Sequence, residues 1–300
     1  MKNLIIILLV LSFIGFGIYL FTKTSSLNTK TVTNTTLSED KEQTKVIENI
    51  EQIKESTVIG KSVLGRDITA YHYGSGDTEL LFVGGIHGGY SWNTVLVAYE
   101  LSDYLKTNAD IISKNIKVTI IPVLNPDGLN KVVGNLSRFT KTDVSSSQTV
   151  KISGRFNANN VDLSRNFDCN WKSAGVWQTK TVSGGSKAFS EPESLAIRNY
   201  IETQKPKAVV VWYSAAGGVY ASSCNGEVLP QTSIITNIYA KASGYPAYQS
   251  FDFYETTGDI VNWLAKNNIP AFSILLSTHE DTEWDKNRKG IEALLQYYAK

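Results

Sequence analysis

Short apolar runs alternate with longer amphipathic segments from about residue 55 to the end of the chain. The apolar runs are too short for helices and are bounded by turn residues, so each predicts a buried strand. Strands that alternate with helices indicate an α/β fold with a largely parallel sheet, covered by helices on both faces. The predicted strands are Leu80–Val83, Val118–Val123, Ala208–Trp212 and Ala271–Leu276, and the predicted helices are Thr94–Leu105, Glu193–Thr203, Ser233–Ala242, Asp259–Lys266 and Arg288–Tyr298.

The first 23 residues form a separate segment. An uncharged run of 18 residues, from Leu4 to Phe21, lies between Lys2 and Lys23. As a helix it would span about 27 Å, close to the roughly 30 Å of a bilayer's hydrocarbon core. Such a run is longer than the apolar region of most signal peptides, and no A-x-A-like cleavage site follows. We therefore expect residues 1–23 to be an uncleaved membrane anchor, with a cleaved signal peptide as the alternative.

Polar residues dominate the next stretch. Residues 24–45 are rich in Thr, Ser, Asn and Lys, a composition that cannot bury a core and predicts a flexible linker. Apolar residues then recur at helical spacing between positions 46 and 53, which predicts a short amphipathic helix. The folded domain is accordingly expected to span residues 46–300.

Composition narrows the classes of function. The 29 basic and 28 acidic residues give a net charge of +1, which argues against a nucleic-acid partner. With three histidines and two cysteines, the chain cannot supply a zinc finger, a multi-metal site or a disulfide-dense scaffold. Histidine chemistry must use His72, His87 or His279. Because His72 lies between two tyrosines on a predicted edge strand, we expect it at the surface.

Recognisable motifs follow the predicted strands, where parallel sheets carry their ligand sites. A turn is predicted at one of them, Asn125-Pro126-Asp127-Gly128. The others are Gly84-Gly85-Ile86-His87, Asp162-Leu163-Ser164-Arg165-Asn166-Phe167, Trp212-Tyr213-Ser214, Thr256-Thr257-Gly258-Asp259 and His279-Glu280-Asp281.

In this order and spacing, the motifs resemble the zinc carboxypeptidase family, which includes pancreatic carboxypeptidase A and bacterial cell-wall carboxypeptidases. The resemblance runs from about Ile59 to the C-terminus, and the last motifs are similar to the bacterial branch in particular. It implies a mixed, largely parallel eight-stranded sheet flanked by helices, and a zinc site that hydrolyses peptide C-termini.

The zinc site that this resemblance implies is incomplete. Family members bind zinc through two histidines and a glutamate, and a second glutamate acts as the general base. This chain keeps His87 but has Tyr90, Tyr213 and Leu275 at the other three positions. A catalytic zinc needs about three protein ligands, and loss of a general base typically costs ~10²–10⁴ in rate. We therefore expect no cofactor and no hydrolysis by the family's mechanism.

The residues that recognise a peptide terminus in the family are retained. By resemblance, Arg165 binds the terminal carboxylate, Arg155 corresponds to the transition-state arginine, and Tyr254 caps the bound residue. Ser164 stands where the family has an asparagine. The expected function is a membrane-anchored, extracytoplasmic domain that binds the C-termini of peptides or cell-wall stem peptides without catalysis. The alternatives are an active metallocarboxypeptidase with an atypical metal site, and a purely structural domain.

Each of these residues also has a simpler explanation. His87 would be a hydrogen-bonded turn residue, more readily than a metal ligand. Tyr90 and Tyr213 would fill the space left by zinc and pack on each other. Arg155 and Arg165 would form structural ion pairs.

The two cysteines fall in loops that the family places near the site. Cys169 and Cys224 therefore suggest one disulfide in an oxidising compartment, with two unrelated thiols as the alternative.

Overall fold

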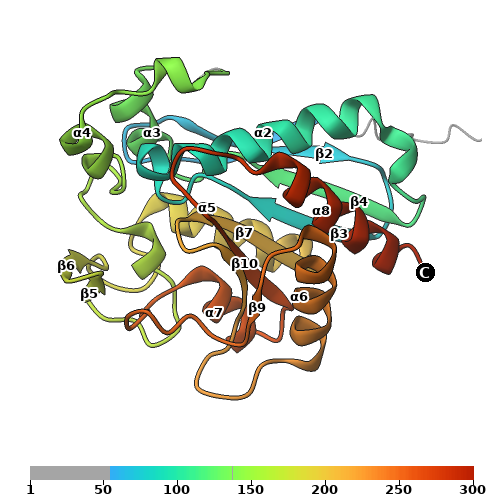
Figure 1. Cartoon of the computed structure of the whole chain (residues 1–300). Coiled ribbons are helices and arrows are strands. Elements are labelled where there is room, and N and C mark those ends of the chain that lie inside the picture. The colour runs from blue at the N-terminus through green and yellow to red at the C-terminus, as the bar shows by residue number, and fades with distance from the viewer. Residues whose placement is uncertain (1–54, 137) are drawn as a thin grey trace, which may run out of the picture. The chain divides into compact units, whose positions relative to one another are not determined.

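An eight-stranded sheet runs through the part of the chain that the computed structural model describes, residues 55–136 and 138–300 (Figure 1). The predicted anchor, the linker and the helix expected at residues 46–53 lie outside these residues. The strand order is β1-β2-β4-β3-β7-β10-β8-β9. Neighbouring strands from β4 to β10 are parallel, as are β8 and β9, whereas β1–β2, β2–β4 and β10–β8 are antiparallel pairs. The mixed, largely parallel α/β fold is thus confirmed.

The strands have the following bounds. Those of the sheet are β1 (Ser56–Lys61), β2 (Asp67–Tyr73), β3 (Thr78–Val83), β4 (Ile116–Ile121), β7 (Ala208–Ser214), β8 (Gly218–Ala221), β9 (Ala247–Tyr248) and β10 (Ala271–Leu276). A separate hairpin consists of β5 (Ala174–Trp177) and β6 (Lys180–Ser183). The four predicted strands correspond to β3, β4, β7 and β10, with small shifts at their ends.

All five predicted helices are present. They are α2 (Trp92–Thr107), α5 (Pro192–Gln204), α6 (Pro230–Ser243), α7 (Ile260–Lys266) and α8 (Trp284–Tyr298), and the structure adds α3 (Pro126–Val133) and α4 (Gln148–Ser153).

The Asn-Pro-Asp-Gly segment is not the turn that its residue types predicted. It begins α3, because the Asn125 side chain accepts a hydrogen bond from the backbone N–H of Gly128 and Pro126 occupies the first turn. The expectation for His72 was also wrong. Strand β2 lies inside β1, so His72 is half-buried, and its ring nitrogens contact the hydroxyls of Thr57 and Thr119 at 2.9 and 3.1 Å.

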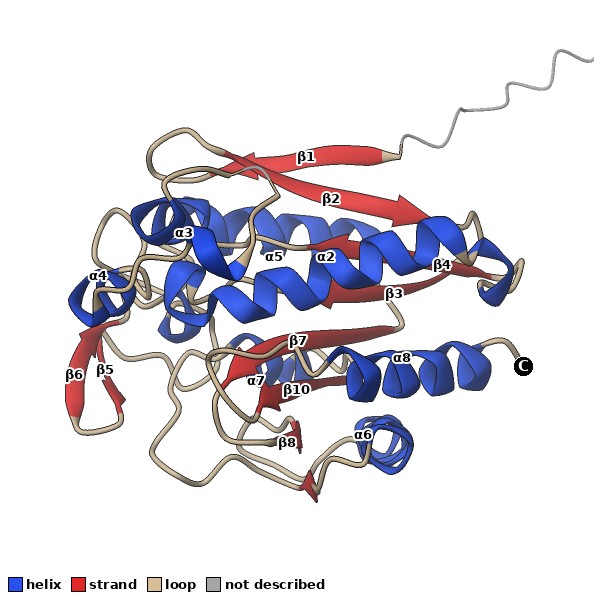
Figure 2. Cartoon of the chain, turned by 45° about the horizontal axis from the view of Figure 1, so that its top comes forward, coloured by secondary structure: helices blue, strands red, loops and turns tan. Residues whose placement is uncertain are grey.

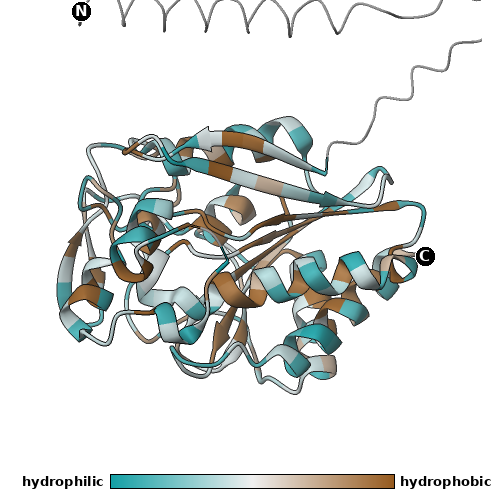
Figure 3. Ribbon diagram, turned by 90° about the horizontal axis from the view of Figure 1, so that it is seen from above, coloured by the Kyte–Doolittle hydropathy of each residue, from teal (hydrophilic) through white to brown (hydrophobic). Residues whose placement is uncertain are grey.

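Helices cover both faces of the sheet (Figure 2). Helices α5 and α7 pack on one face, around buried residues such as Ile197 and Leu264. Helices α2, α6 and α8 pack on the other face, around Leu101, Tyr239 and Leu294. The central strands are accordingly hydrophobic, and the outward helix surfaces are hydrophilic (Figure 3). Within the described residues, no helix has the length and apolar character needed to cross a membrane.

The parallel strands β3, β4, β7 and β10 end at a common edge, and the motif segments emerge from that edge. A disulfide between Cys169 and Cys224 joins the segment after the Arg165 turn to the segment after β8. This bond confirms the pairing that the sequence suggested.

Candidate functional site

A cavity of about 650 Å³ opens at the carboxyl ends of the parallel strands. This is the place where ligand sites form in open α/β sheets. Every site residue predicted from the sequence lines it. These residues are His87, Tyr90, Arg155, Ser164, Arg165, Tyr213, Tyr254 and Leu275.

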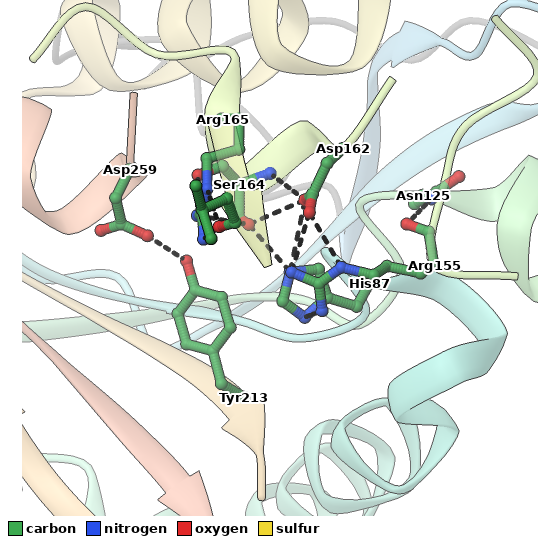
Figure 4. A network of polar contacts seen from close by, with 9 residues as sticks. His87, Asn125, Arg155, Asp162, Ser164, Arg165, Tyr213 and Asp259 are labelled. Atoms are coloured by element: carbon green, nitrogen blue, oxygen red, sulfur yellow. Dashed lines mark hydrogen bonds and ion pairs between the residues drawn. The ribbon is translucent and has the colours of Figure 1, made fainter. Parts of the chain in front are cut away.

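His87 lies in the turn after β3 and is buried. Its Nδ1 is 3.2 Å from Nη1 of Arg155, and its Nε2 is 2.9 Å from Oγ of Ser164 (Figure 4). A guanidinium can only donate hydrogen bonds, so Nδ1 must hold the lone pair and Nε2 the proton. Burial, reinforced by the positive charge of Arg155, lowers the pKa of His87 to about 3. His87 is therefore a neutral, hydrogen-bonded turn residue.

Arg155 forms a buried ion pair with Asp162. Its Nε and Nη2 atoms each lie 2.8 Å from Oδ2 of Asp162, and both side chains are almost fully buried. Burial opposes ionisation of Asp162, but the Arg155 guanidinium and the nearby His87 ring, whose Nε2 lies 3.5 Å from Oδ1 of Asp162, hold its pKa well below the usual range. The other face of Arg155 covers the Trp177 ring, with 4.4 Å to the centroid. Arg155 thus has the structural ion pair that the simpler explanation required.

The two tyrosines at vacated metal positions do not pack on each other, contrary to expectation. Tyr90 packs edge-on against Trp177 of β5, with ring centroids 5.0 Å apart, and against His279 at 4.5 Å. The ring of Tyr213 lies 5.3 Å from that of His87. The rings separate because the β5–β6 hairpin supplies a partner for Tyr90.

The hydroxyl of Tyr213 has its own partner, Asp259. It donates a hydrogen bond of 2.8 Å to Oδ2 of Asp259, whose Oδ1 caps helix α7 by accepting from the backbone of Val261. Burial, followed by the neighbouring Asp259 charge, raises the pKa of Tyr213 well above its ordinary value. Burial also raises the pKa of Asp259. The phenol therefore keeps its proton.

Arg165 differs from Arg155 in its partners. Its side chain is only 2% exposed, yet among the described residues no carboxylate lies within ion-pair distance of it. The guanidinium instead donates to the carbonyl oxygens of Ser164 and Val176, each at 2.8 Å, and lies 5.8 Å from the centroid of Tyr254. The structural ion pair considered for Arg165 is not formed. A buried positive charge in the cavity wall is left without a counter-ion at contact distance.

These donors do not fit zinc. The His87 lone pair that would face a metal accepts from Arg155, and the Tyr213 phenol is protonated. Leu275 offers only hydrocarbon where a base would be needed. In the described part of the chain, no group of three or more His, Cys, Asp or Glu side chains could hold a metal ion.

Four further residues shape the site and were not predicted as site residues. Asp162 and Asp259 stand inside motifs that the sequence displays, but their roles depend on which side chains face them. His279 also stands inside a motif, but it was given no role in the site, and Trp177 carries no local signal. The hairpin and the loop after β10 bring them to Tyr90.

Comparisons with known proteins identify the family. The family model for zinc carboxypeptidases matches residues 43–293. The γ-D-glutamyl-L-diamino acid endopeptidase 1 of Lysinibacillus sphaericus is 24% identical over 245 residues, covering 75% of this chain and 61% of that protein. Murein peptide amidase A of Vibrio campbellii is 30% identical over 154 residues, covering 48% of this chain and 58% of that protein. The chain thus spans about three fifths of the length of these relatives.

Solved structures share the fold. Murein-tripeptide amidase from Escherichia coli O157 superposes with a TM-score of 0.55 at 20% identity, covering 82% of this chain and 92% of that one. Bovine thrombin-activatable fibrinolysis inhibitor gives a TM-score of 0.64 at 18% identity, covering 82% and 88%. With a family model that matches most of its length, the chain belongs to the zinc carboxypeptidase family.

Proposed function

We propose that this chain is a non-catalytic member of its family that binds peptides through their free C-terminal carboxylate. The observation that carries the proposal is the Arg165 guanidinium, which is buried in the cavity wall without a contacting carboxylate. A buried charge without a carboxylate in contact is costly, and a ligand carboxylate offsets that cost with charge-assisted hydrogen bonding. Tyr254, whose ring centroid lies 5.8 Å from the Arg165 guanidinium carbon, would cover the bound residue.

The lack of catalysis is part of the proposal. The family's chemistry needs a metal-bound water and a base to accept its proton. Here the Arg155–His87 contact takes the lone pair of the remaining histidine, and Leu275 cannot accept a proton. A working metallocarboxypeptidase would require both features to change.

We further propose cell-wall stem peptides as the ligand class. Support comes from relatives whose names describe action on γ-D-glutamyl-L-diamino acid bonds and on murein peptides. A domain held outside the cytoplasm would meet such peptides, and residues 1–23 are proposed to hold it at the membrane. The Cys169–Cys224 disulfide supports an oxidising compartment.

Calorimetric titration of the purified domain tests the binding proposal. Short peptides with a free C-terminus are expected to bind with micromolar to millimolar Kd, which corresponds to a binding free energy of roughly 4–8 kcal/mol. The same peptides amidated at the C-terminus are expected not to bind. Binding should persist in EDTA and disappear in Arg165→Ala. Arg138→Ala, which removes a surface arginine paired with Asp103, is the matched control. Equal binding of free and amidated peptides, or none at millimolar concentration, would leave a purely structural domain.

A further inference from the structure

We propose that Ser164 is a positioning residue, which orients the Arg165 guanidinium for a ligand carboxylate and is itself oriented by the remnant of the metal site. This inference rests on the proposed function and assigns that remnant a role in recognition. The residues involved are His87 and Asp162, which contact Ser164, and Arg155, which contacts both of them (Figure 4).

The direction of each hydrogen bond in this group follows from chemistry. Arg155 can only donate, so Nδ1 of His87 accepts and Nε2 carries the proton. Nε2 then donates to Oγ of Ser164 at 2.9 Å. The Ser164 hydroxyl donates in turn to Oδ1 of Asp162 at 2.8 Å, because an ionised carboxylate can only accept. A single placement of the protons is consistent with all of these hydrogen bonds.

The Ser164 hydroxyl is thereby fully used. A hydroxyl has one proton and two lone pairs. Its proton goes to Asp162, one lone pair faces His87, and the other accepts from Nη1 of Arg165 at 3.0 Å. The Ser164 carbonyl oxygen accepts from the same Nη1 at 2.8 Å. Ser164 therefore fixes one side of the Arg165 guanidinium.

The carbonyl of Val176 fixes the other side. It accepts from Nη2 of Arg165 at 2.8 Å and from Nε at 3.3 Å. With both sides held, the long arginine side chain is ordered before the ligand arrives, which reduces the entropy lost on binding.

Charge compensation within the group leaves Arg165 for the ligand. Asp162 pairs with Arg155 rather than with Arg165. Asp259, the other carboxylate in the cavity wall, accepts from Tyr213 and from the N-terminus of α7. In this arrangement, neither carboxylate competes at contact distance for the Arg165 guanidinium.

The test compares Ser164→Ala with Ser164→Thr, which keeps the hydroxyl. Ser164→Ala leaves the Arg165 guanidinium less restrained before binding, so the cost of ordering this side chain is expected to weaken binding of a free-terminus peptide about two- to tenfold. Ser164→Thr should retain most of the affinity. Ser102→Ala is the control, because Ser102 is a buried serine of α2 that lies outside the cavity lining. A purely structural role would not give this dependence on the hydroxyl.

A second measurement needs no ligand. In the unliganded domain, the NMR signal of the Arg165 Nε–H is expected to be sharp and to broaden in Ser164→Ala while the fold persists. Undiminished peptide affinity and an unchanged Arg165 signal in folded Ser164→Ala would overturn the positioning role but leave the proposed function intact. No carboxylate-dependent binding by the native domain would overturn both.

Discussion

Nη1 of Arg155 lies 3.2 Å from Nδ1 of His87, close enough for the arginine to use the lone pair that a metal would need. The contact is part of a buried group in which Asp162 balances the charge of Arg155. A zinc ion approaching His87 would have to displace this cation. Retention of His87 is therefore compatible with a site that binds no metal.

The first prediction concerns zinc content. The domain purified with added zinc and then dialysed is expected to hold well under one equivalent, because only one of three usual ligands remains and its lone pair is used. Elemental analysis by mass spectrometry measures this directly. Stoichiometric zinc that is lost in His87→Ala would show that the site is a working metal centre.

The second prediction concerns reversion. Changing Tyr90→Glu, Tyr213→His and Leu275→Glu together is expected to create zinc binding and weak carboxypeptidase activity, because two ligands and a base are supplied at the cavity and a zinc ion held by them displaces Arg155 from the His87 lone pair. Each single change should have little effect, since residues that act as a unit are strongly non-additive. Zinc calorimetry and a peptide hydrolysis assay provide the readouts. A folded triple variant without zinc affinity would mean that the three positions no longer face a common point.

The third prediction concerns the stability of the folded domain at acidic pH. His87 has a pKa of about 3 when folded and an ordinary value near 6.5 when unfolded. At pH values between these two pKa values, the unfolded chain binds a proton at His87 that the folded chain does not bind. The free energy of unfolding that neutral His87 contributes is therefore lost as the pH falls below 6.5. The expected slope is about 1.4 kcal/mol per pH unit from this group.

Urea denaturation at several pH values between 7.5 and 4.5 measures that slope. His87→Asn, which keeps a donor and an acceptor but does not titrate, should flatten it. His279, with a pKa lowered to about 4 mainly by burial, contributes in the same direction in both proteins. A native chain whose stability does not change over this range would contradict the assignment of a neutral His87.

The fourth prediction concerns the N-terminal segment. The mature protein is expected to keep residues 1–23 and to fractionate with membranes, because an apolar run of this length matches the bilayer core. Protease added outside the cell should cleave the folded domain, and deletion of residues 1–23 should abolish membrane association. A soluble protein whose N-terminus lies between Thr22 and Lys30 would instead establish a cleaved signal peptide.

Periodicity along the sequence was sufficient for the main framework. The runs that became β3, β4, β7 and β10 are continuous and apolar, as buried parallel strands require, and the helices between them are amphipathic. The sequence pattern did not predict the shorter elements. The short strands β5, β6, β8 and β9 follow no hydrophobic pattern long enough to detect, and the Asn125 segment contains residue types that suit both a turn and a helix start.

The sequence by itself determined eight residues of the cavity lining, because its motifs resemble those of the family in order and spacing, and it determined that Leu275 offers no group that accepts a proton. Only the tertiary structure decided which side chains the site residues contact. Arg155 and Arg165 are the same residue type in neighbouring segments, yet one is paired with Asp162 and the other faces the cavity without a contacting carboxylate. Tyr90 and Tyr213 likewise have different neighbours. The physical reason is that ion pairs and ring contacts depend on distances of a few ångströms between chain segments far apart in sequence, and no local pattern encodes those distances.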